Sequence, residues 1–387
     1  MMTRSTRNII ISKKQLRKLL NILAIGLLTV NGIVLNADSP LTSIERKLQT
    51  DIEDTRLDDF SKIEAAFILS GVHRSDSLKY YVNWYNELVE KIRGFPFDRF
   101  DRVEAANQVF SYLHTTWLKQ YDRESTDLLA IVKKQEYNCV AATILYNLIC
   151  EDLGWITEAF ETPTHVYTIF SNFTQQIAVE NTSPMGFNIM RNLHAYSQYL
   201  SHYYPDKEVY RIGLDRLYAY ENSKGRLINN TELLGLLAYN RAYFARKAGR
   251  YDRAYELVLF AQCFNVDSRS NVSFEQNLYY IWGKQLFDRQ RYREAFSVFA
   301  DALYRYPDHR DFLQNTRATF FMTLEQYRQD HLWAETVRLI DEFIMLDVMT
   351  EDDRSQLIRL LEQWKTWPGG PESGEIQKAL NKINSTH

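Results

Sequence analysis

The feature that most constrains the fold of this sequence is an internal repeat in its C-terminal half. The segment G-R-Y-D-R-A begins at Gly249, and the related segment Q-R-Y-R-E-A begins at Gln290. The separation along the sequence between Gly249 and Gln290 also separates Tyr292 from Trp333, which suggests a third copy. A fixed period of this kind is typical of stacked helix pairs, in which each repeat packs only on its neighbours. We therefore expect residues 226–365 to form an α-helical repeat array.

The middle copy of this repeat is the clearest, because it combines large apolar residues with small ones. They are Tyr279, Trp282, Gly283, Leu286, Tyr292, Ala295, Phe299, Ala302 and Pro307. At these spacings the copy resembles a tetratricopeptide repeat, and the resemblance implies a surface for a protein partner. The usual period of that family is shorter, at about 34 residues, so the additional residues would lengthen the helices or enlarge the loops. A plain helical domain with accidental periodicity is the alternative. After the array we expect a linker and one amphipathic helix over residues 366–387.

Residues 1–37 have the layout of an export signal. A flank with several basic residues and no acidic residue precedes an uncharged apolar run, and Asp38 follows. This pattern predicts a signal peptide or an N-terminal membrane anchor. The run is shorter than the about 20 apolar residues of a usual spanning helix, which favours cleavage. In either case we expect the remainder to face outward, as a periplasmic or extracellular protein or anchored in the cytoplasmic membrane.

Charge and cysteine content exclude several classes of protein. The chain has 46 basic and 49 acidic residues, whereas nucleic-acid binding depends on a concentrated basic face, so we expect no nucleic-acid partner. Three cysteines do not make a disulfide scaffold. Cys139 and Cys150 lie too far apart on one predicted helix to form a disulfide, whereas a bond between Cys139 and Cys263 stays open. The histidines lack partners at metal-ligand spacing, and we expect no metal or cofactor.

The middle of the chain predicts a mixed domain over residues 39–225. Apolar residues recur at intervals of three and four up to Leu129, which indicates helices. A polar loop over residues 133–138 leads to Cys139, where a helix begins that runs to Gly154. Three short β-rich pieces predict a small antiparallel sheet. They lie at residues 155–160, 165–170 and 176–180. The expected fold is thus an α+β domain followed by helical repeats, mostly α overall.

Three side chains of this domain suit thiol chemistry. Cys139 falls in the first turn of its helix, where the helix dipole and free backbone N–H groups favour an anion. A thiolate nucleophile needs an imidazole and a group that orients it, and the strands supply His165 and Glu180. The backbone N–H of Cys139 would contribute to an oxyanion hole. The second donor stays open between Gln135 and Tyr137.

The runs that carry these three residues resemble a known superfamily. They are Y-N-C-V-A-A-T-I-L-Y-N-L-I-C-E-D-L-G-W, E-T-P-T-H-V-Y-T-I-F and I-A-V-E-N-T-S-P-M-G-F. Together they resemble the core of bacterial transglutaminase-like proteins, which are papain-related Cys-His-Asp enzymes. The resemblance implies that Cys139 is the nucleophile, His165 the proton carrier and Glu180 the orienting acid, with no cofactor. The commonest third residue in that family is Asp, so the neighbouring Asn181 stays an alternative to Glu180.

The sequence thus predicts an exported thiol enzyme that acts on peptide or amide bonds of a protein or peptide substrate, by hydrolysis or amide transfer. The alternative is a non-catalytic scaffold of the same fold that binds a protein partner through its repeats. In that case Cys139 is an ordinary buried cysteine, His165 a core histidine and Glu180 a solvated strand end.

Overall fold

The computed structural model describes residues 41–97, 101–172, 175–189, 193–202, 204–366 and 373–385. The expected export signal or anchor at residues 1–37 lies outside these residues. From Ser43 onward the chain forms one compact unit, which is mostly helical with small sheets and confirms the expected mostly-α class. Among the described residues, no helix combines the length and apolar character needed to cross a membrane.

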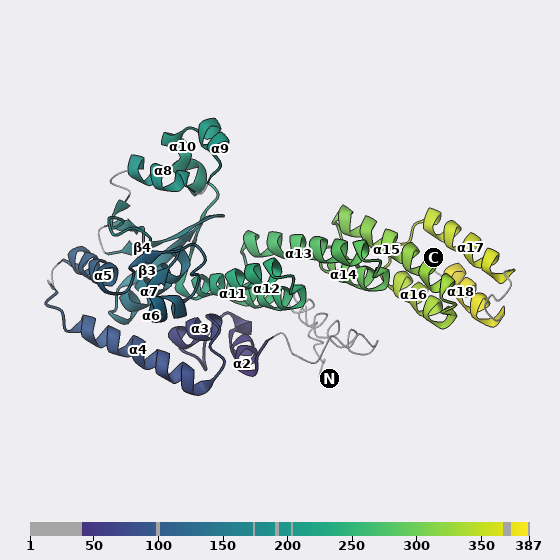
Figure 1. Ribbon diagram of the computed structural model, residues 1–387, viewed down its shortest axis with the longest axis horizontal. Coiled ribbons are helices and arrows are strands. Elements are labelled where there is room, and N and C mark those ends of the chain that lie inside the picture. Colours follow the sequence, from purple (N-terminus) through teal and green to yellow (C-terminus); the bar gives the residue numbers. More distant parts are fainter. Residues whose placement is uncertain are drawn as a thin grey trace, which may run out of the picture. The chain divides into compact units, whose positions relative to one another are not determined.

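Helices form the N-terminal part of this unit (Figure 1). They are α2 (Ser43–Asp51), η1 (Ile52–Asp54), α3 (Lys62–Leu69), α4 (Ser75–Arg93), α5 (Arg102–Thr116) and α6 (Leu128–Lys134). The segment 133–138, which was expected to be a loop, is only partly one. The end of α6 and the strand β2 (Glu136–Tyr137) lie within this segment, and β2 pairs in parallel with β1 (Gln120–Tyr121).

Helix α7 (Cys139–Asp152) is the central element of the mixed domain, and every residue from Cys139 to Cys150 is buried. It packs on α3, α5, α6 and the sheet (Figure 1). Gly154 follows the helix in a left-handed conformation with φ of 75°. The N–H groups of Gly154 and Trp155 bond to the carbonyls of Glu151 and Cys150, which is a Schellman ending. The helix thus begins at the predicted cysteine and ends two residues before the predicted glycine, which closes its C-terminus.

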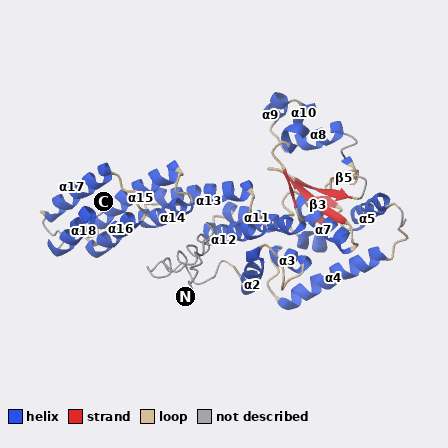
Figure 2. Cartoon of the chain, turned by 180° about the vertical axis from the view of Figure 1, so that it is seen from behind, coloured by secondary structure: helices blue, strands red, loops and turns tan. Residues whose placement is uncertain are grey.

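The three predicted strands are present and form an antiparallel sheet (Figure 2). They are β3 (Ile156–Glu161), β4 (Val166–Ser171) and β5 (Gln176–Val179). A fourth strand, β6 (Arg226–Ile228), was not predicted, and it pairs with β3 at the edge. The sheet therefore extends past the expected domain boundary at 225/226. This strand is so short that it gave no detectable alternation of apolar and polar residues.

Helix α7 packs on one face of the sheet. The opposite face is covered by the short helices α8 (Leu193–Ser201), α9 (Asp206–Ile212) and α10 (Leu214–Asn222). Tyr167 and Ala178 on this face pack with Tyr196, Leu200 and Leu217 from α8 and α10. Because side chains alternate along a strand, the neighbouring residues of β4 point to the opposite face, toward α7. The sheet is thus held between α7 on one face and α8 with α10 on the other.

The C-terminal part consists of successive helices (Figure 1), and their starting residues preserve the period read from the sequence. They are α11 (Asn230–Lys247), α12 (Tyr251–Phe264), α13 (Arg269–Asp288), α14 (Tyr292–Arg305), α15 (Arg310–Gln329), α16 (Trp333–Met345), α17 (Glu351–Lys365) and α18 (Ser373–Ser385). Helices α12, α14 and α16 begin at Tyr251, Tyr292 and Trp333, which are the three positions that the sequence repeat aligns. Short connections make sequential helices antiparallel neighbours.

Longer helices, not larger loops, account for a period above the about 34 residues of a usual tetratricopeptide repeat. Helices α13 and α15 each have 20 residues. The expected C-terminal helix is present as α18, and it is not a detached tail. Its residues Ile376, Leu380 and Ile383 join a hydrophobic cluster with Leu357 of α17 and Phe343 of α16.

Gly283 lies where α13 and α14 approach each other. A Cβ atom at this position would lie 2.4 Å from the ring of Phe299. We expect Gly283→Ala to lower the free energy of unfolding by about 1–3 kcal/mol, because the Phe299 ring must move in a packed core. Urea unfolding followed by circular dichroism measures this loss.

The matched control is Gly374→Ala on α18, where an added Cβ has nothing within 4 Å. The control should be neutral or slightly stabilising, since Ala favours a helix. Equal unfolding midpoints for the two variants would contradict the close packing of α13 on α14.

Candidate functional site

The first residue of α7 is Cys139, and Asn138 fixes this start. The Asn138 side chain accepts a hydrogen bond from the N–H of Ala141 at 3.1 Å, as an N-cap residue does. The first N–H groups of a helix have no partner within it. The Cys139 side chain therefore lies at the positive end of a buried helix, and it opens into a cavity.

A tight turn between β3 and β4 fixes His165. The His165 N–H donates to Oγ1 of Thr162 at 3.0 Å, and the Thr162 N–H donates to the His165 carbonyl at 2.8 Å. The imidazole also meets the ring of Tyr199 edge to face, with 5.5 Å between the centroids. Both the backbone and the ring of His165 are thus held in place.

Glu180 directly follows β5 and faces His165. Its Oε2 lies 2.6 Å from Nε2 of His165, and both side chains are almost completely buried. Its Oε1 accepts hydrogen bonds from the N–H and the hydroxyl of Thr182, at 3.1 and 2.5 Å. The backbone is closed by a bond from the Glu180 N–H to the carbonyl of Gly186. A Cβ at Gly186 would lie 1.9 Å from the Glu180 carbonyl oxygen, so only glycine fits there.

Asn181, the other candidate for the orienting residue, points elsewhere. Its Nδ2 donates to Oγ1 of Thr168 at 2.8 Å. The Thr168 hydroxyl continues to Asn147 of α7, whose Nδ2 donates to Asn230 of α11 at 2.8 Å. Asn181 therefore belongs to a buried polar network that joins the sheet to α7 and α11, whereas Glu180 contacts the imidazole.

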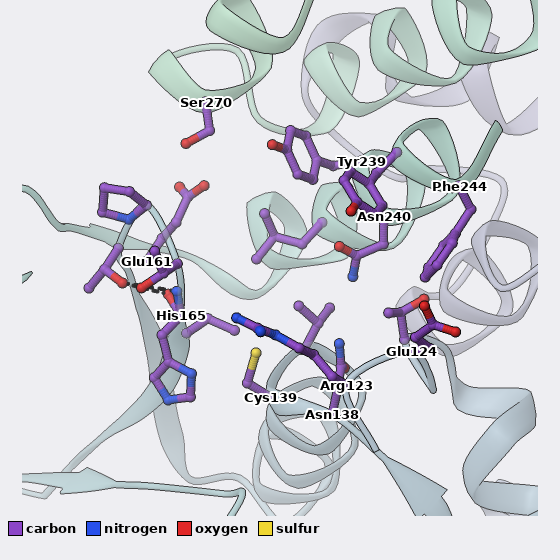
Figure 3. Close-up of a pocket in the computed structure, with 18 of the residues that line it drawn as sticks. Arg123, Glu124, Asn138, Cys139, Glu161, His165, Tyr239, Asn240, Phe244 and Ser270 are labelled. Carbon is purple, nitrogen blue, oxygen red and sulfur yellow. Dashed lines mark hydrogen bonds between the residues drawn. The ribbon is translucent and has the colours of Figure 1, made fainter. Parts of the chain in front are cut away.

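Cys139 lies beside the imidazole of His165 (Figure 3). Burial disfavours the charged ring, but the Glu180 carboxylate and then the neighbouring Cys139 side chain favour it, and they raise the pKa of His165 from 6.5 to about 10. Since Nε2 faces Glu180, Nδ1 is the nitrogen that is left to face the thiol. At neutral pH the site therefore holds an imidazolium between a carboxylate and a sulfur atom.

The side chains of Gln135 and Tyr137, the two alternatives for the second oxyanion donor, are directed away from this site. The Gln135 amide donates to the carbonyl of Thr116 at 3.3 Å. The Tyr137 hydroxyl donates to the carbonyl of Thr182 at 3.3 Å. Neither residue is among the described residues that line the cavity. The backbone N–H of Cys139, at the start of α7, stays the candidate predicted from the sequence.

The cavity beside Cys139 has a volume of about 490 Å³ and is lined by residues from several elements. Arg123 and Glu124 come from the segment after β1, and Arg123 extends across the cavity toward Cys139 (Figure 3). Asn240 and Phe244 come from α11 of the helical array. None of these residues was predicted at the site. No local signal could have placed α11 there, because its contact with α7 forms only in the folded chain.

The other cysteines lie away from the cavity. Cys150 is completely buried within α7, and burial raises the pKa of its thiol. Cys139 and Cys150 are both unbridged, so the disulfide that was left open between Cys139 and Cys263 is not formed. Within the described ranges, no group of three or more His, Cys, Asp or Glu side chains is placed to hold a metal ion.

The sequence matches none of the protein-family models and none of the curated proteins with which it was compared.

The charged state of His165 predicts a pH-dependent stability. Because the folded-state pKa of about 10 exceeds the ordinary 6.5, the folded protein holds a proton that the unfolded chain has lost between these values. The stabilisation is complete below about pH 6.5 and disappears as the pH rises to about 10. We expect the free energy of unfolding to fall over this range by up to about 1.4 kcal/mol per pH unit.

The measurement is urea unfolding at several pH values for the wild type and His165→Gln. Other groups titrate in both proteins, so the difference between the two curves reports His165. A difference that does not change between pH 6.5 and 10 would contradict the imidazolium.

Proposed function

We propose that this protein is an exported, transglutaminase-like thiol enzyme that acts on peptide or amide bonds through Cys139, His165 and Glu180. One observation carries the proposal. The imidazole of His165 lies between the Glu180 carboxylate, at 2.6 Å, and the Cys139 thiol, and this thiol opens into a cavity at a helix N-terminus. The buried order of thiol, imidazole and carboxylate is that of a nucleophile, a proton carrier and its orienting group.

In the first step Cys139 attacks the carbonyl carbon of the substrate as a thiolate, a form that an adjacent imidazolium favours. A C–S bond forms, and the carbonyl oxygen becomes an oxyanion near the first backbone N–H groups of α7. His165 then gives its proton to the amide nitrogen, the C–N bond breaks, and the amine leaves. The product is a thioester between the substrate acyl group and Cys139.

In the second step water or an amine attacks the thioester. The now neutral His165 takes the proton of the attacking group, the C–S bond breaks, and the thiolate leaves with the electron pair. Glu180 stabilises the imidazolium that forms again. Water gives hydrolysis and an amine gives amide transfer. No cofactor takes part in either route.

The C-terminal helices in this proposal are tetratricopeptide-like repeats that take part in protein interaction. The preserved repeat period and the close approach at Gly283 support this assignment. Export rests on the residue pattern at positions 1–37, which favours the periplasm, the extracellular space or the outer face of the cytoplasmic membrane.

Selective alkylation tests the nucleophile. We expect iodoacetamide to modify Cys139 at least tenfold faster than Cys150, because Cys139 opens into a cavity beside an imidazolium whereas Cys150 is enclosed in α7. Peptide mass spectrometry over a time course measures both rates, and His165→Ala should remove most of the difference. If both cysteines react equally slowly and His165→Ala changes nothing, the chain is better described as a non-catalytic scaffold.

Substitution of the orienting acid tests the role of Glu180. We expect Glu180→Gln to slow alkylation of Cys139 at pH 7 by roughly tenfold or more, because a neutral amide no longer favours the imidazolium. The matched control is Glu158→Gln on β3, a partly exposed position on the same sheet. The role assigned to Glu180 would be wrong if both variants keep the wild-type rate while their folded content is unchanged.

A further inference from the structure

Helix α11 of the repeat array forms one wall of the cavity that contains Cys139. Leu236, Asn240 and Phe244 are four residues apart, so they lie on one face of this helix, and all three line the cavity. Tyr239 and Tyr243 of the same helix also line it. The thiol site is therefore bounded partly by the array, not by the mixed domain alone.

This wall is anchored firmly to the mixed domain. At the start of α11, Asn230 receives a hydrogen bond from Asn147 and donates to the carbonyl of Thr157. On the side of α11 away from the cavity, Arg241 donates to the carbonyl of Leu69 at 3.1 Å and forms an ion pair with the buried Glu45 at 2.7 Å. Helix α11 is thus held in place beside the cavity.

One polar atom of this wall lacks a partner. Nδ2 of Asn240 is buried, and it has no hydrogen-bond partner among the described residues. The amide points into the cavity toward Cys139 (Figure 3). A buried donor without an acceptor costs free energy and needs an explanation. An acceptor oxygen on a bound molecule would satisfy it.

We propose that Asn240 is a substrate-binding residue, and that its Nδ2 donates to a backbone carbonyl oxygen of a peptide held between Cys139 and α11. This inference rests on the proposed thiol function and adds to it a substrate-binding residue and a role for the array. The first helix of the array then positions the substrate at the nucleophile, because a peptide bound to it lies against Cys139.

Two reagents separate this inference from the proposed function. Iodoacetamide is too small to need Asn240, so it reports only the reactivity of Cys139. A panel of capped tripeptidyl chloromethyl ketones reports peptide binding as well, since Cys139 displaces chloride only after the peptide is seated. Mass spectrometry of the full chain gives the labelling rate for each reagent as a function of its concentration.

Two variants remove the donor. Asn240→Leu keeps the size of the side chain and Asn240→Ala reduces it, so a loss that both share is not a steric effect. The matched control is Asn277→Leu on α13, an exposed position outside the residues that line the cavity. Because Nδ2 of Asn240 has no protein partner, its removal should leave the melting temperature unchanged or higher, which shows that the variants fold.

We expect both Asn240 variants to lower the rate of peptidyl labelling about tenfold, mainly through a higher half-saturating concentration of the reagent. Iodoacetamide should label Cys139 in these variants at the wild-type rate. The Asn277→Leu control should keep wild-type rates of labelling. Wild-type peptidyl labelling in both folded Asn240 variants would overturn the inference and leave the proposed function intact. If no peptidyl reagent labels wild-type Cys139 faster than Cys150, the proposed function itself fails, and the role of Asn240 fails with it. A lower melting temperature for both variants would instead assign Asn240 a structural role and overturn the inference.

Discussion

The structure depends on the burial of a single helix, α7, between the sheet and the helices around it. All of its residues from Cys139 to Cys150 are buried, so neighbours must supply partners for its polar side chains. Asn147 accepts a hydrogen bond from Thr168 of the sheet and donates one to Asn230 of the array. The same contacts that bury α7 therefore fix the sheet and the first helix of the array around the sulfur of Cys139.

This arrangement places charge where water is excluded. The carboxylate of Glu180 is compensated by hydrogen bonds from Thr182 and by the imidazolium of His165. A buried charge persists only when it is paired in this way. Removal of Glu180 or His165 leaves the other charge uncompensated, so these two side chains are expected to act as one unit. The fold thus supplies a preorganised site, in which little has to move when a substrate binds.

Local patterns in the sequence were sufficient to predict α7, the three strands and the helical array. The asparagine, cysteine and glycine that bound α7 follow capping rules, and turn residues separate the three strands, so these elements could be predicted. The period of the helical array likewise follows from the repeated residues at Tyr251 and Tyr292. The short strand β6 could not be predicted, since its pairing with β3 forms only in the folded chain. The contributions of Asn240 and Arg123 to the cavity depend on contacts between segments that are distant in sequence.

The most direct test of the central claim is the protonation state of His165, measured by nuclear magnetic resonance of ¹⁵N-labelled histidine between pH 5 and 11. We expect both ring nitrogens of His165 to carry protons at pH 7 to 9, and this ring to titrate near pH 10. The signal is assigned by its loss in His165→Gln. A His165 ring that is neutral at pH 7 would contradict a site in which an imidazolium joins Glu180 to the Cys139 nucleophile.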